Sequence, residues 1–215
     1  MQVILDISAN THQNDPDVMR EIFRSIWLGG KHRRSIVVKT QLWCESNPQG
    51  NNEKTTVAGL RSFIKLARES GFEATSSVFD AWSLKKLLAH NVPFVKIACQ
   101  SKLARLAERV PRGVPVYRSC NRVSHKSRQL MNKYDRELFC IPKYPAKQDK
   151  YNIAIQCGEY SISDHTVGLG VFNALKELSS ARKIYECHYV LERNDTNPDA
   201  GPFAKTPEDL REMFA

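Results

Sequence analysis

The chain has 215 residues, and its 32 lysine and arginine residues against 23 aspartate and glutamate residues give a net charge of +9 with histidine neutral. Its 41% of hydrophobic residues suffices for a full core, which excludes a disordered, highly charged tail as the main interpretation. No apolar run approaches the roughly 18 to 20 residues of a membrane-spanning helix, and the first residues lack the features of a secretion signal. We therefore expect a single cytoplasmic domain over residues 1–215.

The cysteines and the charge narrow the class of protein further. Six cysteines stand at positions 44, 99, 120, 140, 157 and 187, with no CxxC pair. This spacing is typical neither of a disulfide framework nor of a structural zinc site, so we expect reduced thiols. The basic excess indicates an anionic partner, either a nucleic acid or a phosphorylated metabolite.

In the first half of the chain, buried apolar runs alternate with segments of helical period, a pattern typical of a parallel sheet with crossover helices. Strands are predicted at Val3–Ser8, Ser35–Trp43, Phe72–Phe79 and Phe94–Cys99. Helices are predicted after Asp15-Pro16, over Thr56–Ser70, after the cap Asp80, and around Leu103–Val110.

The second half continues the alternation less regularly. Strands are predicted at Pro115–Cys120, Glu137–Lys143, Asn152–Gln156 and Lys183–Leu191, and helices at Ser127–Tyr134, Val171–Leu178 and from Thr206. Eight strands predict a closed (β/α)8 TIM barrel whose sixth helix is shortened or missing. An open doubly wound sheet is the alternative, disfavoured because Ser8–His12 contains no glycine for a phosphate-binding fingerprint.

Polar residues at the predicted C-terminal ends of the strands form the candidate site, because (β/α)8 enzymes carry their functional groups there. Lys39 and Lys96 lie inside otherwise apolar runs, where an ammonium is costly unless it meets an anion. Pointing into one barrel, they would form a phosphate or carboxylate site. The alternative is that each points outward between helices and reaches water. The other polar residues at these ends are Asp6, Gln41, Ser76, Ser77, Ser119, Tyr144, His165 and His188.

Two of these residues suggest a metal. His165 and His188 stand at the mouths of strands that are neighbours in the predicted barrel, with carboxylates nearby to fix the imidazole tautomer. Two protein nitrogens would leave coordination positions open for water and substrate, as Lewis-acid catalysis requires. A histidine that is simply hydrogen-bonded in the core is the alternative for each.

Seven short segments then stand in a fixed order: Val38-Lys39-Thr40-Gln41, Ser76-Ser77-Val78-Phe79-Asp80, Val95-Lys96-Ile97-Ala98, Cys140 with Tyr144-Pro145, Ser163-Asp164-His165-Thr166-Val167-Gly168, Glu186-Cys187-His188-Tyr189 and Asn197-Pro198-Asp199. They resemble, in this order, the VKFQ, STPFD, YKIAS, cysteine-to-YP, SDHTxG, EKHF and GPD motifs in the barrel domain of the N-acetylneuraminate (sialic acid) synthase family. One such match is weak, but seven in order, each at its expected strand, are specific.

The resemblance implies a metal-dependent synthase that condenses phosphoenolpyruvate with an aldose or aminosugar aldehyde, forms a nonulosonic acid and releases phosphate. It implies that His165 and His188 bind a divalent metal, manganese before magnesium or cobalt. The residues that it implies for phosphoenolpyruvate are Lys39, Gln41, Ser77, Lys96, Ser119 and Ser163. It assigns catalytic roles to Asp6, to Lys96, to Tyr144 near the reacting centre and to Asp199 at the sugar hydroxyls.

The chain also departs from the family pattern. Asp6 is one methylene shorter than the glutamate of the family's first strand, and Cys99 and Ser101 replace a serine and a glutamate after the fourth. Ile141 and Pro142 replace polar positions. The family continues beyond the position of Ala215 into an antifreeze-like domain, which supplies an arginine to the partner subunit's site. The resemblance thus implies either that a separate polypeptide supplies this arginine or that the acceptor is not N-acetylmannosamine. The partners that it implies are a second copy of the chain, in a homodimer, or a separate protein that carries the C-terminal domain.

Two other functions stay open. The carboxylate missing at Ser101 motivates an aldolase or lyase that acts on a 2-keto acid, with Lys96 as the Schiff-base candidate. The charge of +9 motivates a degenerate barrel that binds nucleic acid or a protein partner. We rank this binding module lowest, because a drifting scaffold has no reason to keep metal and phosphate residues in register.

Overall fold

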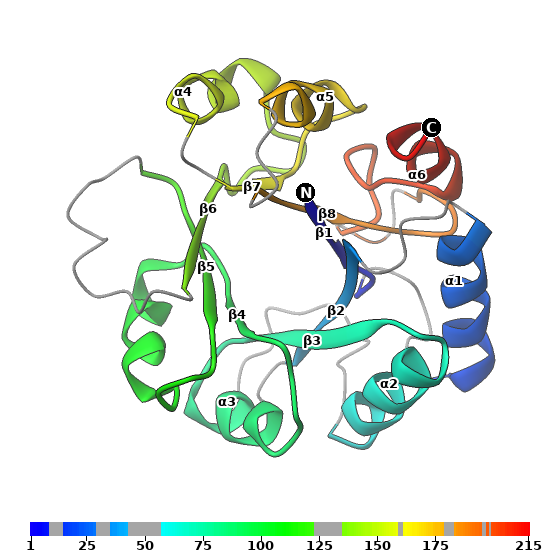
Figure 1. The fold of residues 1–215 in the computed structure, drawn as a ribbon, viewed down its shortest axis with the longest axis vertical. Coiled ribbons are helices and arrows are strands. Elements are labelled where there is room, and N and C mark those ends of the chain that lie inside the picture. The colour runs from blue at the N-terminus through cyan, green and yellow to red at the C-terminus, as the bar shows by residue number, and fades with distance from the viewer. Residues whose placement is uncertain are drawn as a thin grey trace.

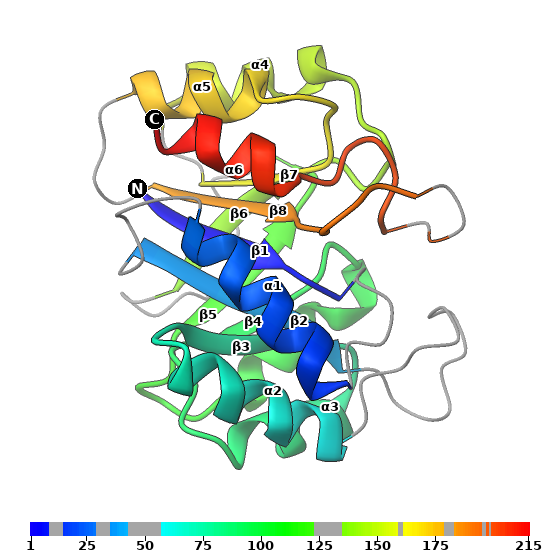
Figure 2. The ribbon, with the colours of Figure 1, turned by 90° about the vertical axis from the view of Figure 1, so that its right-hand side faces the viewer.

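The computed structural model describes residues 1–8, 15–28, 35–42, 57–122, 135–158, 161–178, 183–194, 197 and 199–215. Eight parallel strands follow one another around a closed barrel, and the last pairs with the first (Figure 1). Helices surround the strands, and in the side view both chain termini lie on the same side of the molecule (Figure 2). The predicted (β/α)8 TIM barrel is confirmed.

The strands are β1 (Gln2–Asp6), β2 (Ile36–Leu42), β3 (Glu73–Val78), β4 (Val95–Ile97), β5 (Val116–Cys120), β6 (Arg136–Cys140), β7 (Ser161–Asp164) and β8 (Ile184–His188). The α-helices are α1 (Pro16–Leu28), α2 (Val57–Glu69), α3 (Ala81–Leu88), α4 (Asn152–Gln156), α5 (Gly170–Glu177) and α6 (Pro207–Met213). The described residues also form the 3-10 helices η2 (Ser101–Arg109) and η4 (Gln148–Tyr151). The helix predicted at Ser127–Tyr134 lies outside the described residues.

One predicted strand is wrong. Residues 152–156 form helix α4, and the seventh strand is Ser161–Asp164 instead. The alternating apolar residues misled the prediction, because Ile153 is 54% exposed and the small Ala154 between the isoleucines is 1% exposed. The single turn of η4 and the five residues of α4 are all the helix between β6 and β7, so the shortened sixth helix is confirmed.

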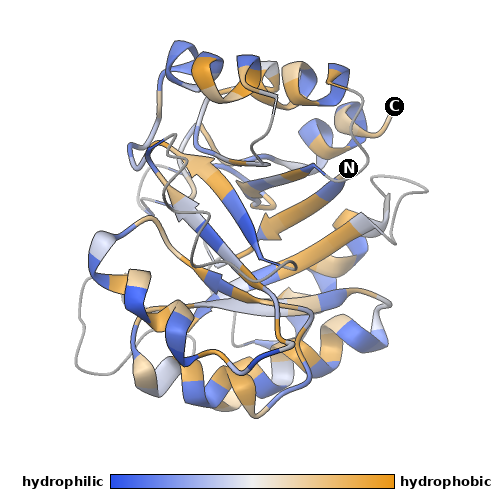
Figure 3. Cartoon of the chain, turned by 60° about the vertical axis from the view of Figure 1, so that its left-hand side comes forward, coloured by the Kyte–Doolittle hydropathy of each residue, from blue (hydrophilic) through white to orange (hydrophobic). Residues whose placement is uncertain are grey.

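Local sequence explains how the helices begin and which face they bury. Asp80 caps α3 through a reciprocal capping box with Ser83, and Thr206 caps α6 in the same way with Asp209, ahead of Pro207. Each helix places an apolar stripe against the strands and a polar stripe outward (Figure 3). No described helix has the length and hydropathy that a membrane crossing needs.

Inside the barrel, the positions nearer the N-terminal ends of the strands are apolar. We call them the apolar floor: Ile4, Val37, Phe94, Tyr117, Leu138 and Ile184. The rings of Phe94 and Tyr117 stack within it, with centroids 3.9 Å apart. Because side chains alternate along a strand, the residue two positions further on faces the same interior. Those positions hold what we call the polar layer: Asp6, Lys39, Lys96, Ser119, Cys140 and Glu186.

Candidate active site

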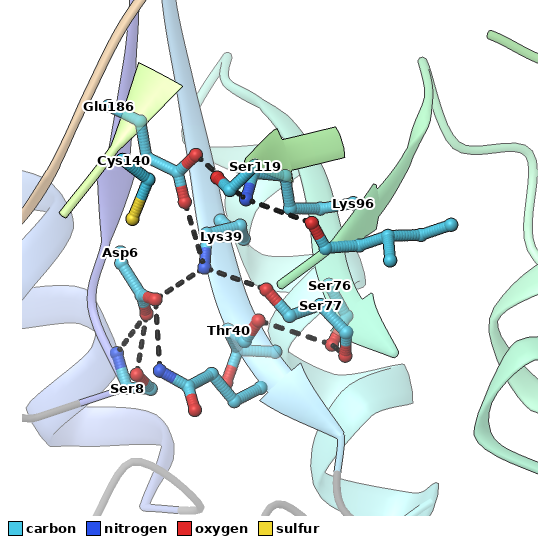
Figure 4. Close-up of polar contacts among 12 residues, drawn as sticks. Asp6, Ser8, Lys39, Thr40, Ser76, Ser77, Lys96, Ser119, Cys140 and Glu186 are labelled. Atoms are coloured by element: carbon cyan, nitrogen blue, oxygen red, sulfur yellow. Dashed lines mark hydrogen bonds and ion pairs between the residues drawn. The ribbon is translucent and has the colours of Figure 1, made fainter. Parts of the chain in front are cut away.

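Lys39 occupies the middle of the polar layer and is 2% exposed. Its Nζ donates to the carboxylate of Asp6 and, at 2.9 Å, to Oγ of Ser77, and lies 3.4 Å from Oε1 of Glu186 (Figure 4). Burial alone would lower the pKa of Lys39, but the charges of Asp6 and Glu186 raise it above its usual value. Lys39 therefore points into the barrel as an ammonium ion, and the outward alternative is wrong.

Lys96 also contacts the carboxylate of Glu186, at the oxygen that Lys39 does not contact. Its Nζ donates to Oγ of Ser119 at 2.8 Å and lies 3.1 Å from Oε2 of Glu186 (Figure 4). Glu186 thus contacts one lysine with each of its oxygens. Two buried ammonium groups and their hydroxyl partners converge on one point, which is the arrangement that an anion-binding site needs.

Asp6 completes the charge balance of this layer. Its carboxylate accepts hydrogen bonds from Lys39, from Nε2 of Gln41 at 3.0 Å and from the hydroxyl of Ser8 at 2.5 Å. Burial alone would raise the pKa of Asp6, but the charges of Lys39 and His188 hold it well below its usual range. Asp6 is consequently an ionised hydrogen-bond acceptor.

The two histidines lie together next to this layer, both buried, with ring centroids 5.3 Å apart. Nδ1 of His165 is 2.8 Å from the carbonyl oxygen of Ile141. A carbonyl only accepts, so Nδ1 carries the proton and the lone pair of Nε2 stays available. Burial, with the charge of His188, lowers the pKa of His165 to about 3. Nδ1 of His188 is buried without a hydrogen-bond partner among the described residues.

Two aromatic rings flank the histidines. The ring of Tyr144 lies 4.2 Å from that of His165 and 5.8 Å from that of His188, and Phe203 contacts all three rings. Tyr144 is 50% exposed and therefore stands at the rim. Burial of its hydroxyl, together with nearby groups that include Cys140 and Asp199, raises the pKa of Tyr144, which keeps the phenol protonated.

The remaining predicted site residues lie nearby without joining the lysine network. Ser163 is buried on β7, in register with Cys140 on one side and Glu186 on the other. Asp199 follows β8, and its negative charge contributes to the raised pKa of Tyr144. Ser76 donates to the backbone carbonyls of Thr40 and Ser77, so its hydroxyl hydrogen-bonds to the sheet backbone and not to the lysines.

A fully buried ion pair supports the histidine segments from behind. Nζ of Lys205 lies 3.4 Å from Oδ2 of Asp164 and donates to the carbonyls of Thr166 and Phe203 at 2.7 and 3.1 Å. The Tyr185 hydroxyl donates to the same carboxylate oxygen at 2.6 Å. Lys205 thereby ties the segment after His165 to the segment that carries Phe203.

The residues present fit a divalent metal at the histidine pair. His165 keeps a free ring nitrogen, and His188 has an orphaned one in a buried setting. Imidazole nitrogens suit transition metals such as zinc, iron or nickel, whereas manganese prefers oxygen ligands, which water and substrate would have to supply. Within the described part of the chain, no cluster of three or more histidine, cysteine, aspartate or glutamate side chains is grouped to hold a metal. The chain would therefore supply two ligands.

Sequence reasoning missed Glu186 and the meeting of Cys99 with Cys140. Glu186 lies in an otherwise apolar strand two positions before His188, so the argument that selected Lys39 and Lys96 also applied to it. The thiol of Cys99 lies 4.0 Å from the carbonyl oxygen of Cys140, although 41 positions separate the two residues. The five described cysteines are free thiols, as predicted.

The fold and site together define a (β/α)8-barrel protein with a buried layer of paired lysines and carboxylates and an imidazole pair at the C-terminal ends of its strands. The model of the NeuB family matches residues 50–215. The chain belongs to this family, as its sialic acid synthase motifs predicted.

Solved structures share the fold at low sequence identity. The N-acetylneuraminic acid (sialic acid) synthetase of Leptospira borgpetersenii serovar Hardjo-bovis, solved with citrate, superposes with a TM-score of 0.78 at 18% identity, over 98% of this chain and 80% of that one. The spore coat polysaccharide biosynthesis protein SpsE of Bacillus subtilis gives 0.74 at 21% identity, over 99% and 65%. The phospho-2-dehydro-3-deoxyheptonate aldolase (DAHP synthase) of Thermotoga maritima gives 0.66 at 13%, over 99% and 67%. A search of curated proteins by sequence finds no match.

Proposed function

We propose that this chain condenses phosphoenolpyruvate with an aldose or aminosugar aldehyde in the cytoplasm, forming a nonulosonic acid and releasing phosphate. The convergence of Lys39 and Lys96 beside the His165 and His188 pair carries the proposal. Membership of the NeuB family and the fold shared with a sialic acid synthetase support it.

The lysine network would bind the anionic substrate. Lys39 with Ser77, and Lys96 with Ser119, offer two ammonium groups and two hydroxyls to the carboxylate and phosphate of phosphoenolpyruvate. Asp6 and Gln41 would hold Lys39 in place. Asp6 would not transfer a proton, because its pKa lies well below its usual range and its carboxylate is therefore a weak base. Glu186 would keep the two lysines at one spacing.

The histidine pair would receive the second substrate. His165 and His188 would hold a divalent metal such as Mn²⁺, which when bound supplies Lewis-acid polarisation of an aldehyde carbonyl. Tyr144, protonated and at the rim, would donate a hydrogen bond there, and Asp199 would accept from sugar hydroxyls. Carbon 3 of phosphoenolpyruvate would bond to the aldehyde carbon, water would add at carbon 2, and phosphate would leave.

A Schiff-base aldolase is the weaker alternative. An imine-forming lysine reacts as a neutral amine, whereas Lys96 forms an ion pair with Glu186 at 3.1 Å. Borohydride treatment with pyruvate separates the two, because only the aldolase would acquire a covalent adduct at Lys96.

The test combines phosphate release with metal analysis. Wild type loaded with Mn²⁺ should release phosphate from phosphoenolpyruvate only when a suitable aldose from a panel is present. His165→Ala should retain no metal where wild type retains about one equivalent, since a two-ligand site does not survive the loss of one ligand. His90→Ala is the matched control, because His90 follows α3, far from the barrel mouth in the fold. Silence of a metal-loaded wild type with every aldose would contradict the proposal.

A further inference from the structure

Two thiols meet at the edge of the polar layer although no motif links them. Cys140 ends β6, whereas Cys99 lies two residues beyond the end of β4. The Sγ of Cys99 is 4.0 Å from the carbonyl oxygen of Cys140, and the two side chains also interact with each other. Because Cys99 lies outside the β4 ladder, its segment can shift toward Cys140 without breaking strand hydrogen bonds.

The two thiols differ in access. Cys99 is partly exposed, whereas Cys140 is buried with its Sγ 3.9 Å from Nδ1 of His165. A small solute therefore reaches Cys99 first and finds Cys140 behind it. Such an arrangement, an accessible thiol with a second thiol in reach, is typical of cysteines that oxidise reversibly.

The surroundings of Cys99 also favour its reactive form. The interaction with Cys140 lowers the pKa of Cys99, burial opposes this, and the charge of Lys96 lowers it further. The thiolate is the nucleophile in reactions with peroxides, so a nearby ammonium raises the reactive fraction.

We propose that Cys99 and Cys140 form a modification site for hydrogen peroxide that closes into a disulfide. The Cys99 sulfur attacks one peroxide oxygen, an S–O bond forms as the O–O bond breaks, and the hydroxide that leaves takes up the thiol proton as water. The sulfur of Cys140 then attacks the sulfenic acid, an S–S bond forms as the S–O bond breaks, and a second water leaves. Two thiols lose two electrons in total, and one peroxide is reduced to two waters.

This inference does not depend on the proposed synthase activity, because the modification is measured by mass. Its consequence for the site would come through Cys140, whose sulfur contacts the His165 ring. Closing the disulfide would draw that sulfur toward Cys99 and change the packing behind a proposed metal ligand.

Trypsin makes the test direct, since it releases Cys99 in residues 97–102 and Cys140 in residues 137–143, each as the only cysteine of its peptide. Native full-length protein is treated with an equimolar amount of hydrogen peroxide, alkylated and digested. We expect the two peptides joined, and Cys99 thiol consumed about tenfold faster than the exposed Cys157. In Cys140→Ser the joined peptides should be absent, and dimedone should trap a sulfenic acid on Cys99.

Cys157→Ser is the matched control and should leave the joined peptides unchanged, because Cys157 lies at the end of α4. Oxidation of Cys157 without oxidation of Cys99 would overturn the proposal. A sulfenic acid that accumulates on Cys99 in wild type, with Cys140 still free, would overturn it equally. Either result stands whether or not the protein releases phosphate from phosphoenolpyruvate.

Discussion

The candidate site has two halves, and each offsets the energetic cost of burying polar side chains in a different way. The lysine half consists of Asp6, Lys39, Lys96 and Glu186, in which each ammonium group faces at least one carboxylate. The histidine half consists of Tyr144, His165, His188 and Phe203, which contact one another through their rings. The halves are contiguous, since Asp6 pairs in register with His188.

This difference shows which half of the site has its charges balanced by residues of the chain itself. Charges in the lysine half neutralise one another, and removing Lys39 or Glu186 leaves a buried partner, Asp6 or Lys96, without its ion pair. In the histidine half, burial lowers the pKa of His165, and Nδ1 of His188 has no hydrogen-bond partner among the described residues. We therefore expect the first half to contribute more to stability, whereas the second keeps a ring nitrogen without a partner among the described residues.

Lys39→Met should give the largest difference in stability between a variant of the lysine half and one of the histidine half. It leaves the buried carboxylate of Asp6 without its lysine and Glu186 with Lys96 alone, and we expect a loss of about 3 to 5 kcal/mol in the free energy of unfolding. His188→Phe, which removes no ion pair to a lysine, should cost about 1 kcal/mol or less. Urea unfolding of both variants against wild type measures the contrast, and equal losses would show that the halves do not differ in this way.

The pH dependence of stability should come next in size. The pKa of His165 is about 3 in the fold against 6.5 ordinarily, so as pH falls through this window the unfolded chain binds a proton that the folded chain refuses. Stability of the metal-free protein should fall by about 1.4 kcal/mol per pH unit from this residue. Asp6, whose pKa is depressed, contributes loss only below about pH 4.

His165→Gln should remove most of that slope between pH 6 and 5, as measured by urea unfolding with a chelator present. His90→Gln provides the comparison, because His90 is only partly buried and should carry a smaller share of the slope. A slope unchanged in His165→Gln would mean that the imidazole is not held neutral by burial.

Tyr151→Phe tests the smallest effect, on the support of the histidine half. The Tyr151 hydroxyl donates to the carbonyl of Ser163 at 3.0 Å and accepts from the amides of Ile141 and His165 at 3.3 Å. Its loss should cost about 1 kcal/mol of stability. It should also weaken Mn²⁺ binding measured by titration, while Tyr117→Phe in the apolar floor should leave metal binding unchanged.

Much of this site follows from strand periodicity. Asp6, Lys39 and Lys96 each stand two positions beyond an apolar residue that faces the barrel interior, so their inward direction and common level were predictable from the strands. The motif order then predicted the family, which the match over residues 50–215 confirms. The binding roles of these residues stay predictions.

What the sequence did not reveal depends on closure of the barrel. The strand Ser161–Asp164 has a single strongly apolar residue, so its pattern was weaker than that of the helix before it. Cys99 follows β4 and Cys140 ends β6, two strands that β5 separates, and Lys205 reaches Asp164 from the segment before α6. Such partners carry no local signal, because only the tertiary fold brings them together.

The stacked rings of Phe94 and Tyr117 close the barrel beneath the charged residues. Because hydrocarbon fills that end, a molecule that reached Lys39 or Lys96 would have to come from the opposite end of the barrel, where His165 and Tyr144 lie.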